Sequence, residues 1–138
     1  MQDLDIAKRT LANSDYTCVL CRDGALTVSE RRGVAPLLQW LETGISPGFC
    51  AADKVVGRAT AYLYCLLGAK AVHGRVMSEP ALQVLRQHGI TAQYETLVRQ
   101  IRNRQNTGSC PMEAATADCQ TPEHALAAIR EALKNLQS

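Results

Sequence analysis

The segment AVHGRVMSEPALQVLRQHGITAQY, residues 71–94, decides the fold. Residues 71–77 predict a β-strand, and residues 90–94 predict a second one. Between them, residues 80–88 predict a helix that ends at Gly89. A strand, a helix and a strand in this order give a parallel pair joined by a right-handed crossover. The segment therefore predicts an α/β fold.

The rest of the chain extends this pattern in both directions. Asp23-Gly24 favours a type I′ turn and predicts a hairpin between strands at 16–20 and 25–28. Helices are expected at 4–11, 33–41, 52–66, 94–101, 111–118 and 122–136, with Pro36 in the first turn of the second, Gly68 after the third and Thr121 capping the last. The loops are expected at 44–48 and 103–109. This order predicts a mixed sheet covered on both faces, a three-layer α/β/α sandwich.

Composition limits the class of protein. A chain of 138 residues with 46% apolar residues is long enough for one core, so we expect a single domain over 1–138. The net charge of +2 is spread along the chain, and no basic stripe predicts nucleic-acid binding. The longest apolar run, 59–69, is short of the ~20 residues of a membrane span. The N-terminus has no apolar core of a secretory signal, so we expect a cytoplasmic protein.

The six cysteines are expected to be reduced thiols, because the chain can build a core without disulfides. Cys18 and Cys21 form a CxxC pattern. They lie in a segment that alternates like a strand, so their thiols are expected on opposite faces of the sheet. This argues against a metal or redox pair formed by these two residues.

Two short stretches place polar residues where a helix is expected to begin. Asp53 and Lys54 are expected in the first turn of the helix at 52–66, where an acid complements the helix dipole. Ser78 is the expected N-cap of the next helix, with Glu79 in its first turn. Either stretch can serve its helix alone. In open α/β sheets, however, this edge is also where ligands bind.

These stretches resemble the helix openings of the cytidine deaminase superfamily, which read His/Cys-Ala-Glu and Pro-Cys-x-x-Cys. On that pattern Ala51 stands at the first zinc ligand, Asp53 at the proton-shuttling glutamate, and Ala81 and Val84 at the two cysteines. Alanine and valine cannot bind zinc, and aspartate is shorter than the glutamate. The resemblance therefore implies a cytidine deaminase-like fold without zinc, without deaminase activity and with no cofactor expected.

A closer resemblance covers most of the chain. The segments ADKVVGRA (52–59), SEPALQVL (78–85) and NTGSCPMEAA (106–115) are together similar to the bacterial family catalogued as domain-of-unknown-function family 1893. That resemblance implies the deaminase-like fold lacking the zinc ligands.

The third segment places a thiol before a helix whose first residue is Pro111. A helix N-terminus stabilises a thiolate, so Cys110 is a candidate nucleophile, redox thiol or soft-metal ligand. Alternatively, Ser109 or Thr107 caps this helix, Glu113 completes a capping box, and Cys110 is only packed.

These observations lead to one main hypothesis and two alternatives. The main hypothesis is a module that binds a small polar or anionic ligand in the former active-site pocket. Its expected ligand-binding residues are Asp53, Lys54, Ser78, Glu79, Thr107, Cys110 and Glu113. The first alternative is an enzyme or redox protein with Cys110 as reactive thiol and Asp53 or Glu113 handling protons. The second is a soft metal bound by Cys110 with Cys50 and Cys119. By analogy with deaminase-like folds, the protein is expected to form a homodimer.

Overall fold

The protein has an α/β fold built on one five-stranded mixed sheet. A computed structural model describes residues 2–102 and 110–137. The strand order is β2-β1-β3-β4-β5, with β1 antiparallel to both neighbours and β3, β4 and β5 parallel. The strands are β1 (Cys18–Arg22), β2 (Ala25–Ser29), β3 (Cys50–Val56), β4 (Ala71–Ser78) and β5 (Thr91–Val98). The helices are α1 (Gln2–Ala12), α2 (Ala35–Thr43), α3 (Arg58–Leu67), α4 (Glu79–Gln87), α5 (Pro111–Ala115) and α6 (Pro122–Gln137).

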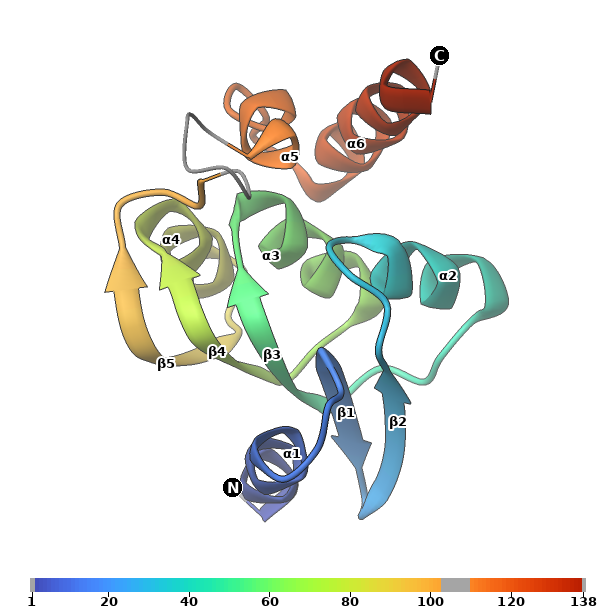
Figure 1. The fold of residues 1–138 in the computed structure, drawn as a ribbon, viewed down its shortest axis with the longest axis vertical. Helices are drawn as coiled ribbons and strands as arrows, with labels where there is room; N and C mark the ends of the chain where they lie inside the picture. The colour runs from blue at the N-terminus through green and yellow to red at the C-terminus, as the bar shows by residue number, and fades with distance from the viewer. Residues whose placement is uncertain (1, 103–109, 138) are drawn as a thin grey trace.

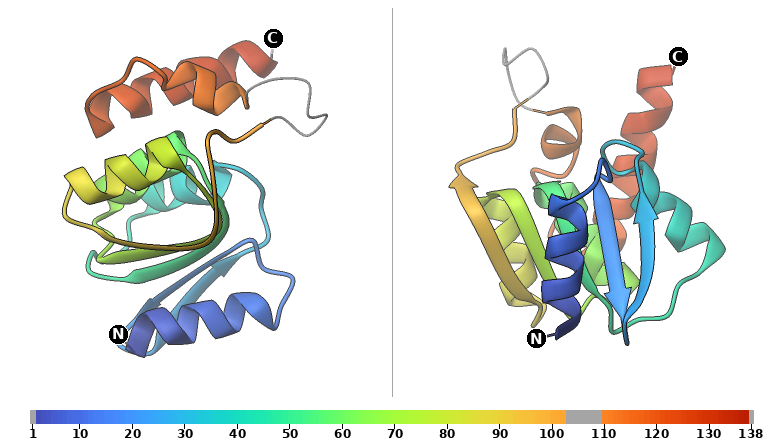
Figure 2. Two further views of the ribbon diagram at one scale, coloured as in Figure 1. Left: turned by 90° about the vertical axis from the view of Figure 1, so that its left-hand side faces the viewer. Right: turned by 60° about the horizontal axis from the view of Figure 1, so that its bottom comes forward.

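The helices cover the two faces of the sheet unequally (Figures 1 and 2). Because β3, β4 and β5 follow one another in one direction, two crossovers of the same hand place α3 and α4 on the same face. Helix α1 lies on the opposite face, against β1 and β3, while α6 packs against α3 on the side away from the sheet. The strand–helix–strand prediction for residues 71–94 is confirmed.

The hairpin between β1 and β2 forms at the predicted turn. Asp23 and Gly24 both have positive φ angles, 53° and 83°, as a type I′ turn requires. The Asp3 carboxylate of α1 accepts hydrogen bonds from the backbone N–H groups of Asp23 (2.9 Å) and Gly24 (3.1 Å). The turn therefore also holds the start of α1 in place.

The predicted helix at 52–66 is wrong in its first part. Residues 50–56 form β3, the central strand, and α3 begins only after Gly57. The apolar residues of a buried strand and of the following helix happen to have the spacing of one helical face, which led to the prediction of a single helix. Residues 50–56 form a strand because they pair with β1 on one side and with β4 on the other. Asp53 and Lys54 are therefore strand residues and do not lie in a first helical turn.

Two predictions near the C-terminus also need correction. Residues 94–101 do not form a helix, because β5 runs to Val98 and pairs with β4 as far as Ser78. Helix α5 ends at Ala115, earlier than the predicted end at 118. The loop predicted at 103–109 lies outside the described residues. Thr121 caps α6 as predicted, accepting a 3.1 Å hydrogen bond from the backbone N–H of His124.

Apolar side chains pack on both faces of the sheet. The larger core lies between the sheet and α3, α4 and α6, and includes Leu63, Met77 and Ile129. Smaller clusters lie beneath α1. Cys21 is buried in one of these, whereas Cys18 packs in the larger core with α3. The two thiols of the CxxC pattern are thus on opposite faces, as predicted. Among the described helices, none combines the length and apolar character needed to cross a membrane.

Candidate functional site

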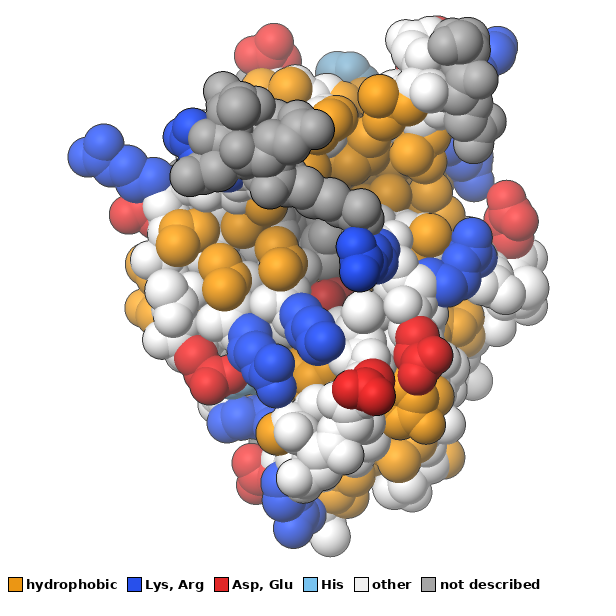
Figure 3. Space-filling model, in the orientation of Figure 1, with side chains coloured by type: hydrophobic (Ala, Val, Ile, Leu, Met, Phe, Trp, Pro, Cys, Tyr) orange, Lys and Arg blue, Asp and Glu red, His pale blue; other side chains and the backbone are white. Residues whose placement is uncertain are grey.

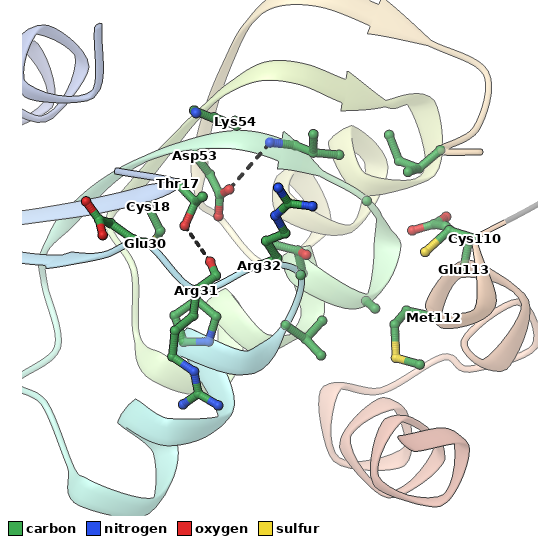
Figure 4. Close-up of a pocket in the computed structure, with 18 of the residues that line it drawn as sticks. Thr17, Cys18, Glu30, Arg31, Arg32, Asp53, Lys54, Cys110, Met112 and Glu113 are labelled. Carbon is green, nitrogen blue, oxygen red and sulfur yellow. Dashed lines mark hydrogen bonds between the residues drawn. The ribbon is translucent and has the colours of Figure 1, made fainter. Parts of the chain in front are cut away.

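A cavity of about 550 Å³ lies beside the carboxyl end of β3. Its wall is formed by β1, the loop between β2 and α2, the β3–α3 junction and α5 (Figure 4). The residues that carry its chemistry are Cys18, Arg32, Asp53, Lys54, Cys110 and Glu113. The volume falls in the range of small-molecule sites.

Asp53 forms the floor of this cavity. Its side chain is buried, and its carboxylate accepts a 2.7 Å hydrogen bond from the hydroxyl of Tyr64 on α3. The same hydroxyl lies 2.9 Å from the sulfur of Cys18. Burial raises the pKa of Asp53 to about 6, although the hydrogen bond from Tyr64 opposes this rise. The floor is therefore a carboxyl that changes charge near neutral pH.

Burial also keeps the two partners of Asp53 uncharged. It raises the pKa values of the Cys18 thiol and the Tyr64 hydroxyl well above their ordinary values, and the nearby Asp53 carboxylate raises both further. Cys18, Tyr64 and Asp53 thus form a hydrogen-bonded chain in which only Asp53 ionises near neutral pH. Asp53 is the member able to accept a proton or a hydrogen bond from a ligand.

Arg32 faces Asp53 across the cavity. Its guanidinium extends into the space between Asp53 and Glu113 (Figure 4). Thr17 holds the loop that carries Arg32, because its hydroxyl donates to the backbone carbonyls of Ser29 (3.1 Å) and Arg31. Charged side chains of both signs spread over this side of the molecule (Figure 3). Lys54 is also a lining residue, but its side chain extends away from Asp53 and the cavity (Figure 4).

Glu113 lies at the other end of the cavity, against the N-terminus of α3. Its carboxylate accepts a hydrogen bond from the backbone N–H of Arg58, the first residue of that helix. Gly57 makes this approach possible, since a Cβ at this position would collide with the carboxylate. Burial raises the pKa of Glu113, and the contact with the helix end lowers it. Glu113 thus caps α3, rather than the start of α5 as a capping box would require.

The other predicted site residues divide into three groups. Cys110 directly precedes α5, is half-buried, and shares the cavity with Asp53 and Glu113. Ser78 and Glu79 do not line the cavity: the Ser78 hydroxyl accepts from the backbone N–H of Ala81 (3.1 Å) as the N-cap of α4, and Glu79 is exposed. Thr107 lies outside the described residues.

The metal alternative does not fit the described part of the chain. Cys50 lies beneath α1 with Leu4, while Cys110 lies in the cavity on the opposite face. Among residues 2–102 and 110–137, no group of three His, Cys, Asp or Glu side chains could hold a metal ion. The hypothesis of a metal bound by Cys50, Cys110 and Cys119 is therefore wrong for these residues.

Neither Tyr64 nor Arg32 is predicted as a site residue from the sequence. Tyr64 lies within an apolar helical run, and its signal would have been the hydroxyl, which needs a partner when a tyrosine is buried. Arg32 lies in a polar connection with no motif around it. Only the folding of the β2–α2 loop over β1 brings it to Asp53.

The fold and cavity define an α/β protein with a polar cavity beside the end of a central strand. The chain belongs to the family described as TM1506, domain of unknown function (DUF1893), whose model matches residues 6–133. The family membership predicted from three sequence segments is confirmed. The fold is similar to a crystal structure of a DUF1893 family protein (TM1506) from Thermotoga maritima, with a TM-score of 0.84 and 21% identity over 97% of this chain and 90% of that chain. At this identity the likeness concerns the fold alone. No curated protein matches the chain.

Proposed function

We propose that the protein binds a small polar ligand that carries both a hydrogen-bond donor and an anionic group. The observation that carries this proposal is the pairing of a buried carboxyl, Asp53, with an inward-pointing guanidinium, Arg32, in one cavity. Asp53 is buried and Arg32 is exposed at the cavity. A ligand with a single charge would engage only one of these groups, whereas a ligand with a donor and an anionic group would form a charge-assisted hydrogen bond with each.

Asp53 and Arg32 have different tasks in this proposal. Asp53, with a pKa of about 6, is mostly ionised at neutral pH and accepts a hydrogen bond from the donor of the ligand. Arg32 binds the anionic group. Tyr64 and Cys18 contact Asp53 from behind and fix its orientation.

The cavity is also consistent with a three-layer, cytidine deaminase-like architecture that has lost its zinc. The residues at the starts of α3 and α4 are Gly57, Arg58, Ser78 and Glu79, and Ala81 and Val84 follow in α4. This set supplies no cysteine or histidine for zinc. The proposal is therefore a binding function, without zinc-dependent deamination.

Titration of isotope-labelled protein with glycine or β-alanine tests this function by nuclear magnetic resonance. Each probe carries an ammonium donor and a carboxylate, while acetate and ethylammonium are matched probes with one charge each. We expect saturable shifts of the backbone N–H signals of Gly33, Val55 and Gly57 with the zwitterions, and weaker ones with the single-charge probes. Asp53→Asn and Arg32→Ala should each weaken binding about tenfold.

Arg130→Ala, in an exposed position of α6, serves as the control variant and should bind like the wild type. Shifts that do not saturate, or that persist unchanged in both Asp53→Asn and Arg32→Ala, would contradict the proposed site.

A reactive thiol at Cys110 is the second candidate function. The observation that favours it is that Cys110 is half-buried and lines the same cavity as Asp53, which can accept a proton near neutral pH. The thiol would then act on a ligand bound between Arg32 and Asp53. Its reactivity is tested by alkylation, as described in the Discussion.

A further inference from the structure

Two cysteines from adjacent strands lie side by side on the same face of the sheet. Cys21 of β1 and Cys50 of β3 are direct partners in the antiparallel register. Both side chains are on the α1 face: the Cys21 thiol donates to the Asp3 carboxylate of α1 (3.5 Å), and Cys50 packs with Leu4 of α1 and Ala71. The CxxC partner of Cys21, Cys18, is on the opposite face.

The register brings this pair within the distance range of a disulfide. Directly opposite residues of antiparallel strands have Cα atoms about 4.5 or about 5.5 Å apart, depending on the type of pair. Disulfides span Cα distances of about 4.4 to 6.8 Å, so either type of pair fits. We infer that Cys21 and Cys50 are a redox modification site that closes to a cross-strand disulfide in the presence of an oxidised organic disulfide.

Helix α1 controls access to this site. Cys21 and Cys50 are 0% and 1% exposed. Burial and the neighbouring Asp3 carboxylate raise the pKa values of both thiols, which disfavours the reactive thiolates while α1 is in place. Asp3 also holds the β1–β2 turn, so the same residue anchors α1 and protects the pair. Oxidation therefore requires the N-terminal part of α1 to move away.

The reaction is an exchange in two steps. The Cys21 thiolate attacks one sulfur of the organic disulfide, forming a mixed disulfide and releasing one small thiolate. The Cys50 thiolate then attacks the sulfur of Cys21, forming the Cys21–Cys50 bond and releasing the second small thiolate. The two protons lost by the protein thiols are taken up by the two released thiolates, which become thiols. The protein is oxidised by two electrons, and the organic disulfide is reduced.

Incubation of the full chain with oxidised glutathione, followed by alkylation, digestion and mass spectrometry, tests this inference. We expect a linked pair of peptides with fragment ions that assign the bond to Cys21 and Cys50, and its loss after treatment with dithiothreitol. Cys21→Ser and Cys50→Ser should each abolish the link. Cys18→Ser and Cys65→Ser, which change cysteines away from the pair, should retain it.

A second variant tests the same disulfide in case the buried pair of the wild type reacts slowly. Leu4→Ala removes a buried contact between α1 and Cys50, so the disulfide should form several-fold faster than in the wild type. Circular dichroism checks that this variant stays folded. The inference is overturned if folded Leu4→Ala protein keeps both thiols reduced, or if the link that forms joins other cysteines. Binding of the zwitterionic probes plays no part in this test, so the two proposals fail independently.

Discussion

The hydroxyl of Tyr64 donates a 2.7 Å hydrogen bond to the carboxylate of Asp53 inside the protein. Tyr64 belongs to α3 and Asp53 to β3, so this bond joins a helix to the strand that precedes it. It satisfies a carboxyl that has been removed from water, and it limits the rise of the pKa of that carboxyl. The chemistry of the cavity floor therefore depends on a residue that does not line the cavity.

The ionisation of Asp53 should make folding stability depend on pH. Its pKa is about 6 in the folded protein against an ordinary value of 3.8, so between these values the folded state holds more protons than the unfolded state. The contribution of Asp53 to stability is therefore present at low pH and is lost as the pH rises through about 6. The full loss is about 3 kcal/mol.

Asp53→Asn removes this titration. The free energy of unfolding of the variant, relative to that of the wild type, should rise by about 2.5 kcal/mol between about pH 4 and about pH 7.5. Urea denaturation at a series of pH values measures this difference, and subtraction of the two curves cancels the other titrating groups. A difference that stays constant with pH would show that Asp53 has its ordinary pKa in the folded protein. A difference that falls as the pH rises would show that its pKa is lowered, and either result contradicts the prediction.

Tyr64→Phe should destabilise the protein and raise the pKa of Asp53 further. The variant leaves the Asp53 carboxylate without its hydroxyl donor, which costs about 1–3 kcal/mol. Carbon-detected magnetic resonance of the Asp53 carboxyl measures the pKa. Tyr62→Phe is the matched control, because Tyr62 donates a 2.7 Å hydrogen bond to the backbone carbonyl of Cys119. It should cost a similar free energy and leave the titration of Asp53 unchanged.

Gly57 and Glu113 should be energetically coupled. Gly57→Ala places a methyl group against the Glu113 carboxylate, so this substitution alone should cost about 2 kcal/mol. Glu113→Ala removes the cap of α3 and should cost about 1 kcal/mol. In the double variant the added cost of Gly57→Ala should fall by at least about 1 kcal/mol, since the obstructing carboxylate is gone. Additive costs in urea denaturation would show that the two side chains do not meet.

Cys110 should be the first thiol alkylated in the folded protein. Four of the other cysteines, Cys18, Cys21, Cys50 and Cys119, are buried, and burial raises the pKa of the Cys65 thiol to about 12. Alkylation with iodoacetamide, followed by mass spectrometry of peptides, measures the order. If Cys110 is a nucleophile, its rate at neutral pH should exceed that of glutathione about tenfold or more. A rate no greater than that of glutathione would remove the second candidate function.

Local sequence determined the elements whose signals are complete within a few neighbouring residues. Asp23-Gly24 specified its turn, Ser78 and Pro80 the start of α4, and Gly68 the end of α3. The strand–helix–strand unit at 71–94 followed from periodicity and these stop signals. The family membership also followed from the residues. Turn and cap preferences act within a few residues, so they can be read without the rest of the fold.

The tertiary structure decided the strand at 50–56, the length of β5 and the composition of the cavity. Helical spacing and a buried strand look alike in an apolar run, and only hydrogen bonding to β1 and β4 separates them. Arg32, Asp53 and Glu113 come from three distant segments, and the neighbouring thiols of Cys21 and Cys50 come from two strands. Their proximity is set by strand register and chain crossings, which no local pattern encodes. The sequence by itself therefore determined the fold class and the family, and long-range packing determined the site.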